Sequence, residues 1–278
     1  MNIFLTGGTG FIGSHFINAA HQAGYTIYAL KRMNSTTRVQ LEKNPIWVIG
    51  DLRSIVDENI IKKIDILVHL AAHSANMPYD TLENCIEWNV IAANKFINQF
   101  IRVNRNIKLI IAGTSFEYGT AGLRYDFIPP DAPLEPTMSY PASKAMASIL
   151  FRTKAIQESL YLKYLRIFQI FGEGEEDSRL WPSLRKAALE GKDFPMTKGE
   201  QVRDFYYVKD LCNDLIRELD FSDIKPGIPL FKNLGSGRPQ SVLEFSQYWW
   251  RKWKAKGNLL IGALPYRNNE VMRYVPKI

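Results

Sequence analysis

The sequence of 278 residues predicts an α/β fold, in which a doubly wound parallel sheet is followed by a smaller C-terminal lobe. Short runs of β-branched and other apolar residues alternate with helical patterns along the first half of the chain. These runs lack polar alternation, which indicates strands that are covered on both faces. Their β-α-β order implies parallel strands joined by right-handed crossovers. After Phe168 the pattern becomes less regular, which marks the start of the second lobe.

The individual elements follow from where the apolar runs begin and end. Strands are predicted at residues 3–5, 26–30, 46–49, 64–70 and 107–112. Helices are predicted at residues 11–23, 82–103 and 181–189. This order divides the chain into a sheet domain, residues 1–168, and a smaller lobe, residues 169–278. A segment around residues 205–234, beginning with 205–208, is expected to return to the first domain.

Composition excludes several classes of function. The net charge is +7, but the cations are scattered and no recognition motif accompanies them, so we expect an anionic small ligand rather than nucleic acid. The two cysteines have neither disulfide nor metal-ligand spacing, so no metal site is expected. No apolar run approaches the roughly 20 residues that span a bilayer, and no signal peptide is visible, so we expect a cytoplasmic protein without a membrane partner.

A glycine-rich turn follows the first predicted strand directly. The run TGGTGFIG, residues 6–13, satisfies G-x-G-x-x-G as well as G-x-x-G-x-x-G, and a helix opens after it. Such glycines let the backbone approach a pyrophosphate, which the helix N-terminus then stabilises. The turn therefore predicts a Rossmann-like dinucleotide site; a purely structural glycine turn is the alternative. The expected cofactor contacts in this turn are Gly7, Gly10, Phe11, Ile12 and Gly13.

The end of the second strand favours NADP(H) over NAD(H). NAD-binding chains usually place an acidic residue there to hold the ribose 2′-hydroxyl, whereas this chain has Lys31 and Arg32. These cations can neutralise a 2′-phosphate, the arginine through two hydrogen bonds. The alternative is that they are ordinary surface cations. Asp51, after the third strand, is a candidate acceptor for the adenine amino group.

Tyr140 and Lys144, in the run YPASK, are four residues apart and share one face of a helix. A cation beside a phenol lowers the phenol's pKa, so we expect Tyr140 to exchange a proton with a substrate oxygen. The alternative is an ordinary helix start. Thr114 and Ser115 end the fifth strand, where a hydroxyl can polarise a carbonyl; a local cap is the simpler role.

Together these stretches resemble the extended short-chain dehydrogenase/reductases, in their nucleotide-sugar epimerase, dehydratase and reductase branch. The C-terminal segment 262–272 is similar to nucleotide-sugar 4-ketoreductases of the CDP-abequose synthase type. The resemblance implies that Thr114, Tyr140 and Lys144 are catalytic, and that the protein is a homodimer through the helix at 82–103 and the tyrosine helix. It also implies further ligands: for the cofactor Leu52, Leu70, Ala71, Ala72, Asn89, Tyr140 and Lys144 beside Asp51, and for the nucleotide sugar Ser115, Arg203 and Arg267. For each arginine, a structural ion pair is the alternative.

Departures from the family pattern narrow the reaction. Dehydratases of this branch carry Asp-Glu where this chain has Ser115 and Phe116, so 4,6-dehydration is not expected. Lys31 replaces the acid of the NAD-retaining epimerases. We therefore predict NADPH-dependent reduction of the C4 ketone of a nucleoside-diphosphate 4-keto-6-deoxyhexose, for deoxysugar and polysaccharide synthesis. The alternatives are an NAD-dependent nucleotide-sugar 4-epimerase and a non-catalytic NADP(H)-binding sensor.

Overall fold

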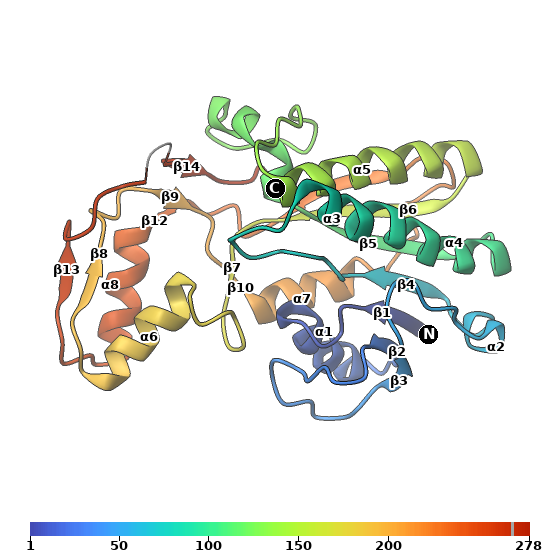
Figure 1. Ribbon diagram of the computed structural model, residues 1–278, viewed down its shortest axis with the longest axis horizontal. Coiled ribbons are helices and arrows are strands. Elements are labelled where there is room, and N and C mark those ends of the chain that lie inside the picture. Colours follow the sequence, from blue (N-terminus) through green and yellow to red (C-terminus); the bar gives the residue numbers. More distant parts are fainter. Residues whose placement is uncertain (268–269) are drawn as a thin grey trace.

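The computed structural model describes residues 1–267 and 270–278, and its centre is a seven-stranded parallel sheet (Figure 1). The strand order is β11-β6-β5-β4-β1-β2-β3. The strands are β1 (Asn2–Thr6), β2 (Thr26–Lys31), β3 (Ile46–Ile49), β4 (Ile66–His69), β5 (Lys108–Thr114), β6 (Tyr161–Ile167) and β11 (Leu230–Leu234). This arrangement confirms the predicted Rossmann-like fold, and each of the five predicted strands is present with small differences at its ends.

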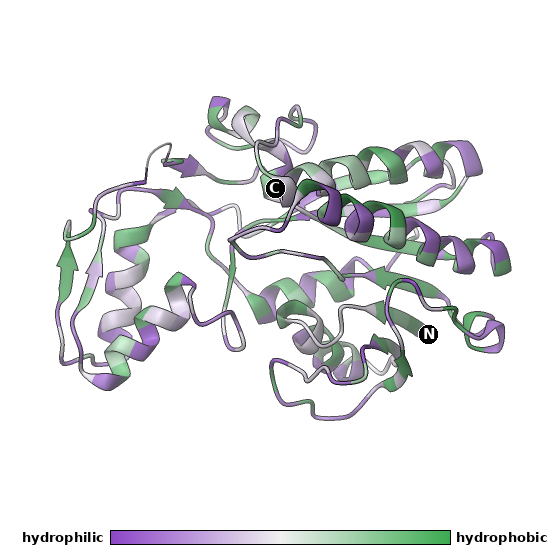
Figure 2. Ribbon diagram, in the orientation of Figure 1, coloured by the Kyte–Doolittle hydropathy of each residue, from purple (hydrophilic) through white to green (hydrophobic). Residues whose placement is uncertain are grey.

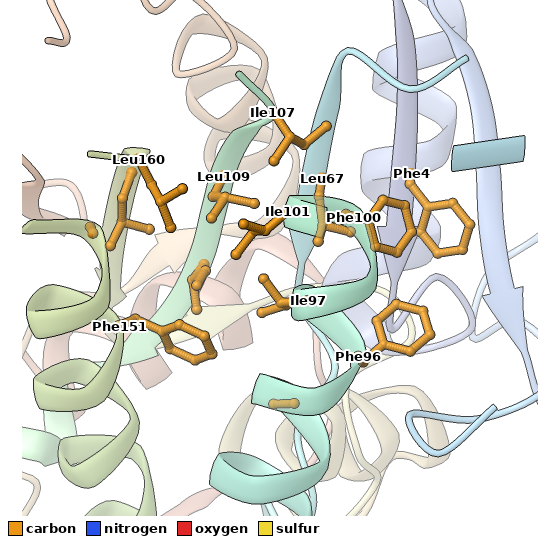
Figure 3. Packing of buried hydrophobic residues seen from close by; sticks show 14 of the residues in the cluster. Phe4, Leu67, Phe96, Ile97, Phe100, Ile101, Ile107, Leu109, Phe151 and Leu160 are labelled. Carbon is orange, nitrogen blue, oxygen red and sulfur yellow. The ribbon is translucent and has the colours of Figure 1, made fainter. Parts of the chain in front are cut away.

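Helices cover both faces of this sheet because its side chains alternate between two apolar cores. Phe4, Leu67 and Leu109 point to one face, where they meet α2 (Glu58–Ile61), α4 (Ala93–Val103) and α5 (Ser139–Glu158) (Figure 3). Ile3 and Leu5 point to the other face, where they meet α1 (Phe11–Gln22) and α7 (Val208–Arg217). Both faces of β1 are therefore buried, as its apolar sequence requires. In Figure 2 the strands of the central sheet are mostly hydrophobic, whereas the helices that cover it carry both hydrophobic and hydrophilic residues.

The predicted long helix at 82–103 is not a regular α-helix. It consists of α3 (Leu82–Ile86), a π-helical turn (Glu87–Ala92) and α4. The π turn places Asn89, whose amide donates to the carbonyl oxygen of His73 at 3.1 Å and to the hydroxyl of Ser143 at 2.9 Å. Turns of this kind inside α-helices often mark functional sites.

The second lobe is built around aromatic side chains and lies at the left of Figure 1. Phe171, Trp181 and Phe245 form its buried centre, against α6 (Leu180–Glu190) and α8 (Val242–Lys252). Short strands complete the lobe: β8 (Phe194–Met196) with β13 (Leu259–Ile261), and β9 (Val202–Arg203) between β12 (Gln240–Ser241) and β14 (Arg273–Tyr274). In the described part of the chain, no helix has the length and apolar character needed to cross a membrane.

Within the segment 205–234, which was expected to return to the first domain, residues 205–208 do not themselves join the central sheet. Its strand β10 (Tyr206–Tyr207) pairs with β7 (Ile170–Phe171) in a separate two-stranded sheet. The later part of the segment does return: α7 packs on α1, and β11 pairs with β6 at the edge of the central sheet. β7 is buried, whereas both residues of β10 are only partly buried.

Phe100 provides a test of the core below α4. Its ring is fully buried and lies 4.7 Å from that of Phe4 in an edge-on arrangement. We expect Phe100→Ala to lower the free energy of unfolding by about 3–5 kcal/mol, because it leaves a cavity between sheet and helix. Ile55→Ala is the control, since Ile55 is 91% exposed, and it should change stability by less than about 0.5 kcal/mol. Urea denaturation measures both; equal values for the two variants would contradict the packing described.

Candidate active site

A cavity of about 640 Å³ runs along the carboxyl ends of the central strands. This is the edge at which open α/β sheets bind their ligands. Most of the residues predicted for the cofactor and the reaction line it: Gly7, Gly10, Phe11, Ile12, Gly13, Arg32, Asp51, Leu52, Leu70, Ala71, Ala72, Thr114, Tyr140 and Lys144. The other residues that were predicted for the site, and that the structure describes, do not line this cavity: Lys31, Asn89, Ser115, Arg203 and Arg267.

The glycine turn forms the floor of the cavity and brings α1 close to β1. Gly7 has a φ of 77°, which favours glycine, and a Cβ on Gly13 would collide with the Gly7 carbonyl. Gly10 is the N-cap of α1 and gives it no side-chain hydrogen bond, so the first backbone N–H groups of the helix are not satisfied by a side-chain cap. This arrangement fits the pyrophosphate of a dinucleotide.

Two arginines stand on the cavity wall beyond β2, near Leu30. Arg32 was expected there, whereas Arg38 was not assigned from the sequence. The Arg38 guanidinium pairs with the Glu176 carboxylate at 2.7 Å and so connects the loop after β2 to the second lobe. Lys31 is directed elsewhere, with its ammonium 5.2 Å from the centre of the Trp47 ring. The sequence shows several basic residues at and after the end of β2. Only the tertiary structure shows that Arg32 and Arg38 line the cavity and that Lys31 does not.

Tyr140, Lys144 and Thr114 come together from α5 and the end of β5. Lys144 is 3% exposed, and its ammonium donates to the Ala112 carbonyl oxygen at 2.7 Å. Burial, followed by the charge of Glu117, raises the pKa of Tyr140, whereas a side-chain hydrogen bond with Thr114 opposes the rise. The expected lowering of this pKa by Lys144 is therefore not what the structure shows, because desolvation of the phenolate dominates. Tyr140 is protonated at neutral pH.

A buried ion pair lies directly beneath Thr114 and was not identified from the sequence as functional. The Nε of Arg166 donates to the Oε2 of Glu117 at 2.7 Å, and neither side chain is more than 5% exposed. The other oxygen of Glu117 accepts from the backbone N–H of Thr114 at 2.9 Å, which forms a capping box around the 3₁₀ turn Ser115–Tyr118. The signal available in the sequence was an acid and a base at the ends of neighbouring apolar strands.

The loop after β4 is fixed by two histidines. His69 is buried beside the Thr6 hydroxyl, 2.8 Å from its Nδ1, and burial lowers its pKa to about 3, so that it is neutral. His73 lines the cavity, and its Nε2 lies 2.7 Å from the carboxylate of Asp80. The backbone N–H of His73 donates to Asn89 at 2.7 Å. Asn89 therefore acts on the cavity through the backbone of this loop.

The predicted substrate residues are dispersed. Ser115 is buried, and its carbonyl oxygen accepts from the Tyr274 hydroxyl at 2.9 Å. Arg203 pairs with Glu270 at 3.1 Å and donates a hydrogen bond to the Val271 carbonyl oxygen at 2.6 Å. The pair with Glu270 is the structural ion pair that the sequence analysis gave as the alternative role of this arginine. Arg267 is exposed, and its neighbours Asn268 and Asn269 in the C-terminal motif lie outside the described residues. No group of three or more His, Cys, Asp or Glu within 1–267 and 270–278 is arranged to hold a metal ion.

Glu175, on the cavity wall, makes the stability of the fold dependent on pH. Burial raises its pKa from 4.5 to about 7, opposed by Arg179, and one of its buried oxygens has no hydrogen-bond partner. As pH rises from the unfolded pKa through the folded one, the unfolded chain releases a proton that the fold retains, so stability falls. We expect Glu175→Gln to stabilise the protein relative to wild type at about pH 8 by up to roughly 3 kcal/mol, and much less near pH 4. Thermal melts at both pH values measure this; an equal difference at both would rule it out.

Comparison with known proteins places the chain in a family. The model of the NAD dependent epimerase/dehydratase family matches residues 3–226. UDP-glucuronic acid decarboxylase 1 of Danio rerio is 25% identical over 257 residues, which cover 88% of this chain and 59% of that protein. This chain thus spans less than two thirds of that relative. The glycan biosynthesis protein Agl12 of Haloferax volcanii is 28% identical, with 89% and 81% covered, and a UDP-glucose 4-epimerase of Corynebacterium glutamicum is 25% identical, with 87% and 77% covered.

Solved structures share the same fold over the whole chain. A UDP-N-acetylglucosamine 4-epimerase of Methanobrevibacter ruminantium, in complex with UDP-N-acetylmuramic acid, has a TM-score of 0.84 at 23% identity and covers 100% of this chain and 89% of its own. TunA, an NAD dependent NDP-hexosamine 5,6-dehydratase, has a TM-score of 0.81 at 24% identity with the same coverage. The family match, the fold and the glycine turn agree: the chain belongs to the NAD dependent epimerase/dehydratase family.

Proposed function

We propose that this protein uses NADPH to reduce the C4 ketone of a nucleoside-diphosphate 4-keto-6-deoxyhexose. The observation that carries the proposal is the buried Tyr140, which lines one cavity together with Thr114, Lys144 and the glycine turn. A phenol at this place can give its proton to the alkoxide that develops when a carbonyl is reduced. The product is a deoxyhexose donor for polysaccharide synthesis.

The residues of the cavity divide the work of such a reduction. NADPH, when bound, supplies the hydride. Tyr140 donates its proton to the C4 oxygen of the sugar, and the hydroxyl of Thr114 donates a hydrogen bond to the same oxygen. Lys144, buried beside them, holds the ribose of the cofactor and contributes a positive charge that stabilises the phenolate left on Tyr140.

The preference for NADP(H) rests on charge at the end of β2. Arg32 and Arg38 both line the cavity there, and the strand ends without an acidic residue. A guanidinium binds two phosphate oxygens at once, so these residues are suited to a 2′-phosphate. Arg38 would have to exchange Glu176 for that phosphate. MoeE5, a solved structure at 22% identity, contains NAD with UDP-glucuronic acid, so NAD use is the competing possibility.

For the nucleotide sugar, we propose that Arg203 and Arg267 hold the pyrophosphate. Arg203 is only 18% exposed and already engages Glu270, so substrate phosphate would replace that carboxylate. Ser115 is proposed to contact the sugar. It adjoins Thr114, at the point where β5 ends.

A 4-epimerase is the second candidate, favoured by the UDP-glucose 4-epimerases among the relatives. An epimerase returns the hydride to the same sugar and therefore retains its cofactor. Purified protein that carries tightly bound NAD, and that turns over without added NADPH, would select this function. A non-catalytic NADP(H) sensor is the third possibility, and it is disfavoured because Thr114, Tyr140 and Lys144 are all present at one cavity.

The decisive experiment is an assay with NADPH and a panel of CDP-, dTDP-, GDP- and UDP-4-keto-6-deoxy sugars. We expect loss of NADPH absorbance with one member of the panel. Tyr140→Phe should lower kcat by about 10²–10⁴-fold, because the proton donor is removed while the ring packing remains. Tyr79→Phe is the matched control, since the Tyr79 ring lies 5.4 Å from that of Tyr140 but is not on the cavity wall. Full activity of Tyr140→Phe would refute the proposed chemistry.

We also propose a homodimer through the outer sides of α4 and α5. Ile91, in the π-helical turn before α4, and Met146 and Ile149 on α5 are between 40% and 59% exposed, and Met146 and Ile149 border a groove of about 550 Å³. Large exposed apolar groups gathered on one surface are typical of an interface.

Ile149→Glu tests this dimer by placing a charge in the apolar groove. Sedimentation of the wild type should give twice the chain mass, and Ile149→Glu should weaken association by at least about 10-fold. Ile55→Glu, at a site that is 91% exposed, serves as control. A wild-type protein that sediments as a monomer at all concentrations would exclude the interface.

A further inference from the structure

We propose that Glu117, held by Arg166, is a positioning residue for the Tyr140–Lys144 pair: it fixes Thr114 at the cavity and acts as the counter-charge of Lys144. This inference rests on the proposed acid–base role of Tyr140, although not on the identity of the sugar. Glu117 does not line the cavity, so it would act through its neighbours.

The contacts of Glu117 connect the three elements that carry the site. Its side chain is completely buried, and its Oε1 accepts from the Thr114 N–H at 2.9 Å and from the Tyr164 hydroxyl at 3.0 Å. The Tyr164 hydroxyl also lies 3.0 Å from the Lys144 carbonyl oxygen on α5. Arg166 occupies the remaining oxygen of Glu117 and also donates to the Pro130 carbonyl at 2.9 Å. A shift of Glu117 would therefore move β5, β6 and α5 relative to one another.

Stability alone does not account for charges at this place. Burial of a carboxylate and a guanidinium carries a desolvation penalty that their attraction offsets only in good geometry. Apolar side chains of similar volume often give equal or greater stability. A fully buried ion pair directly below Thr114 therefore calls for a role that apolar packing does not supply.

That role is electrostatic. Lys144 is 3% exposed, and its ammonium donates to a neutral acceptor, the Ala112 carbonyl. Burial lowers the pKa of Lys144, and the charge of Glu117 opposes this and raises it. The same charge raises the pKa of Tyr140. Burial also raises the pKa of Glu117 itself, and the charge and hydrogen bond of Arg166 oppose that rise. Glu117 thus favours the state in which Lys144 is charged and Tyr140 holds its proton, which is the state needed to donate a proton.

The test is Glu117→Gln, in which an amide oxygen can still accept from the Thr114 N–H but the negative charge is lost. Without that charge, both Lys144 and Tyr140 lose their protons at lower pH. We expect the alkaline limb of the kcat/KM profile to move to lower pH by roughly one unit. The pH at which NADP⁺ binding weakens, followed by tryptophan fluorescence, should move in the same direction, and this second readout needs no sugar substrate.

Two further variants separate charge from structure. Glu117→Asp keeps the charge and should retain the wild-type alkaline limb even if kcat falls. Tyr164→Phe removes one hydrogen bond to the same carboxylate and should lower the melting temperature without moving the limb. If Glu117→Gln fails to fold because Arg166 is left without its partner, the double variant Glu117→Gln/Arg166→Met removes both charges and should show the same acid shift.

Unchanged pH dependence of both kcat/KM and NADP⁺ binding in a folded variant without the Glu117 charge would overturn the inference. So would an equal shift in Tyr164→Phe, because the effect would then come from loosened packing. Failure of the proposed reaction has a different signature: the wild type would not oxidise NADPH with any sugar of the panel, while the binding experiment would still report on Glu117 and Lys144.

Discussion

The central sheet is buried on both faces, and this constraint decides where polar chemistry can be placed. The apolar side chains of β1 and β4 pack into two cores, one on each face of the sheet, and the polar Thr6 and His69 stand where these two strands end. The glycine turn, the loop after His69 and Thr114 all stand at the same edge because the strands are parallel. The cavity is thus a consequence of the sheet's burial and direction.

The same burial determines the electrostatics of the site. Tyr140 and Lys144 are drawn out of water together, and desolvation opposes the charged form of each. Desolvation therefore favours the protonated phenol of Tyr140, whereas the charge of Glu117 opposes the loss of the Lys144 proton. Spacing of four residues on a helix predicts that the two side chains are neighbours. The extent of their burial decides in which direction their pKa values shift.

The family uses one framework for several reactions, as the decarboxylases, epimerases and dehydratases among the relatives show. What differs is the set of side chains around a shared cavity. In this chain Phe116 is 37% exposed beside the Tyr274 ring, and a phenylalanine cannot transfer the proton that dehydration needs. Reduction requires no such acid, which is consistent with the function proposed.

The sequence by itself determined the elements whose cause is local. Apolar runs identified the strands of the first half, and the spacing of Gly7, Gly10 and Gly13 identified the turn, because strand burial and close backbone approach depend on residues near one another in the chain. The fold class and the family follow from these signals.

Tertiary structure decided what depends on residues far apart in the chain. Glu117 pairs with Arg166, 49 positions away in the chain, and Arg203 pairs with Glu270, 67 positions away. The sequence around each residue does not predict which partner it will meet. Arg38 reaches the cavity while Lys31 turns to Trp47, because the packing of the loop after β2 selects between cations of equal charge. The charge of a side chain does not determine which oppositely charged residue it will pair with. The tertiary structure determines the pairs, because it decides which residues lie close together.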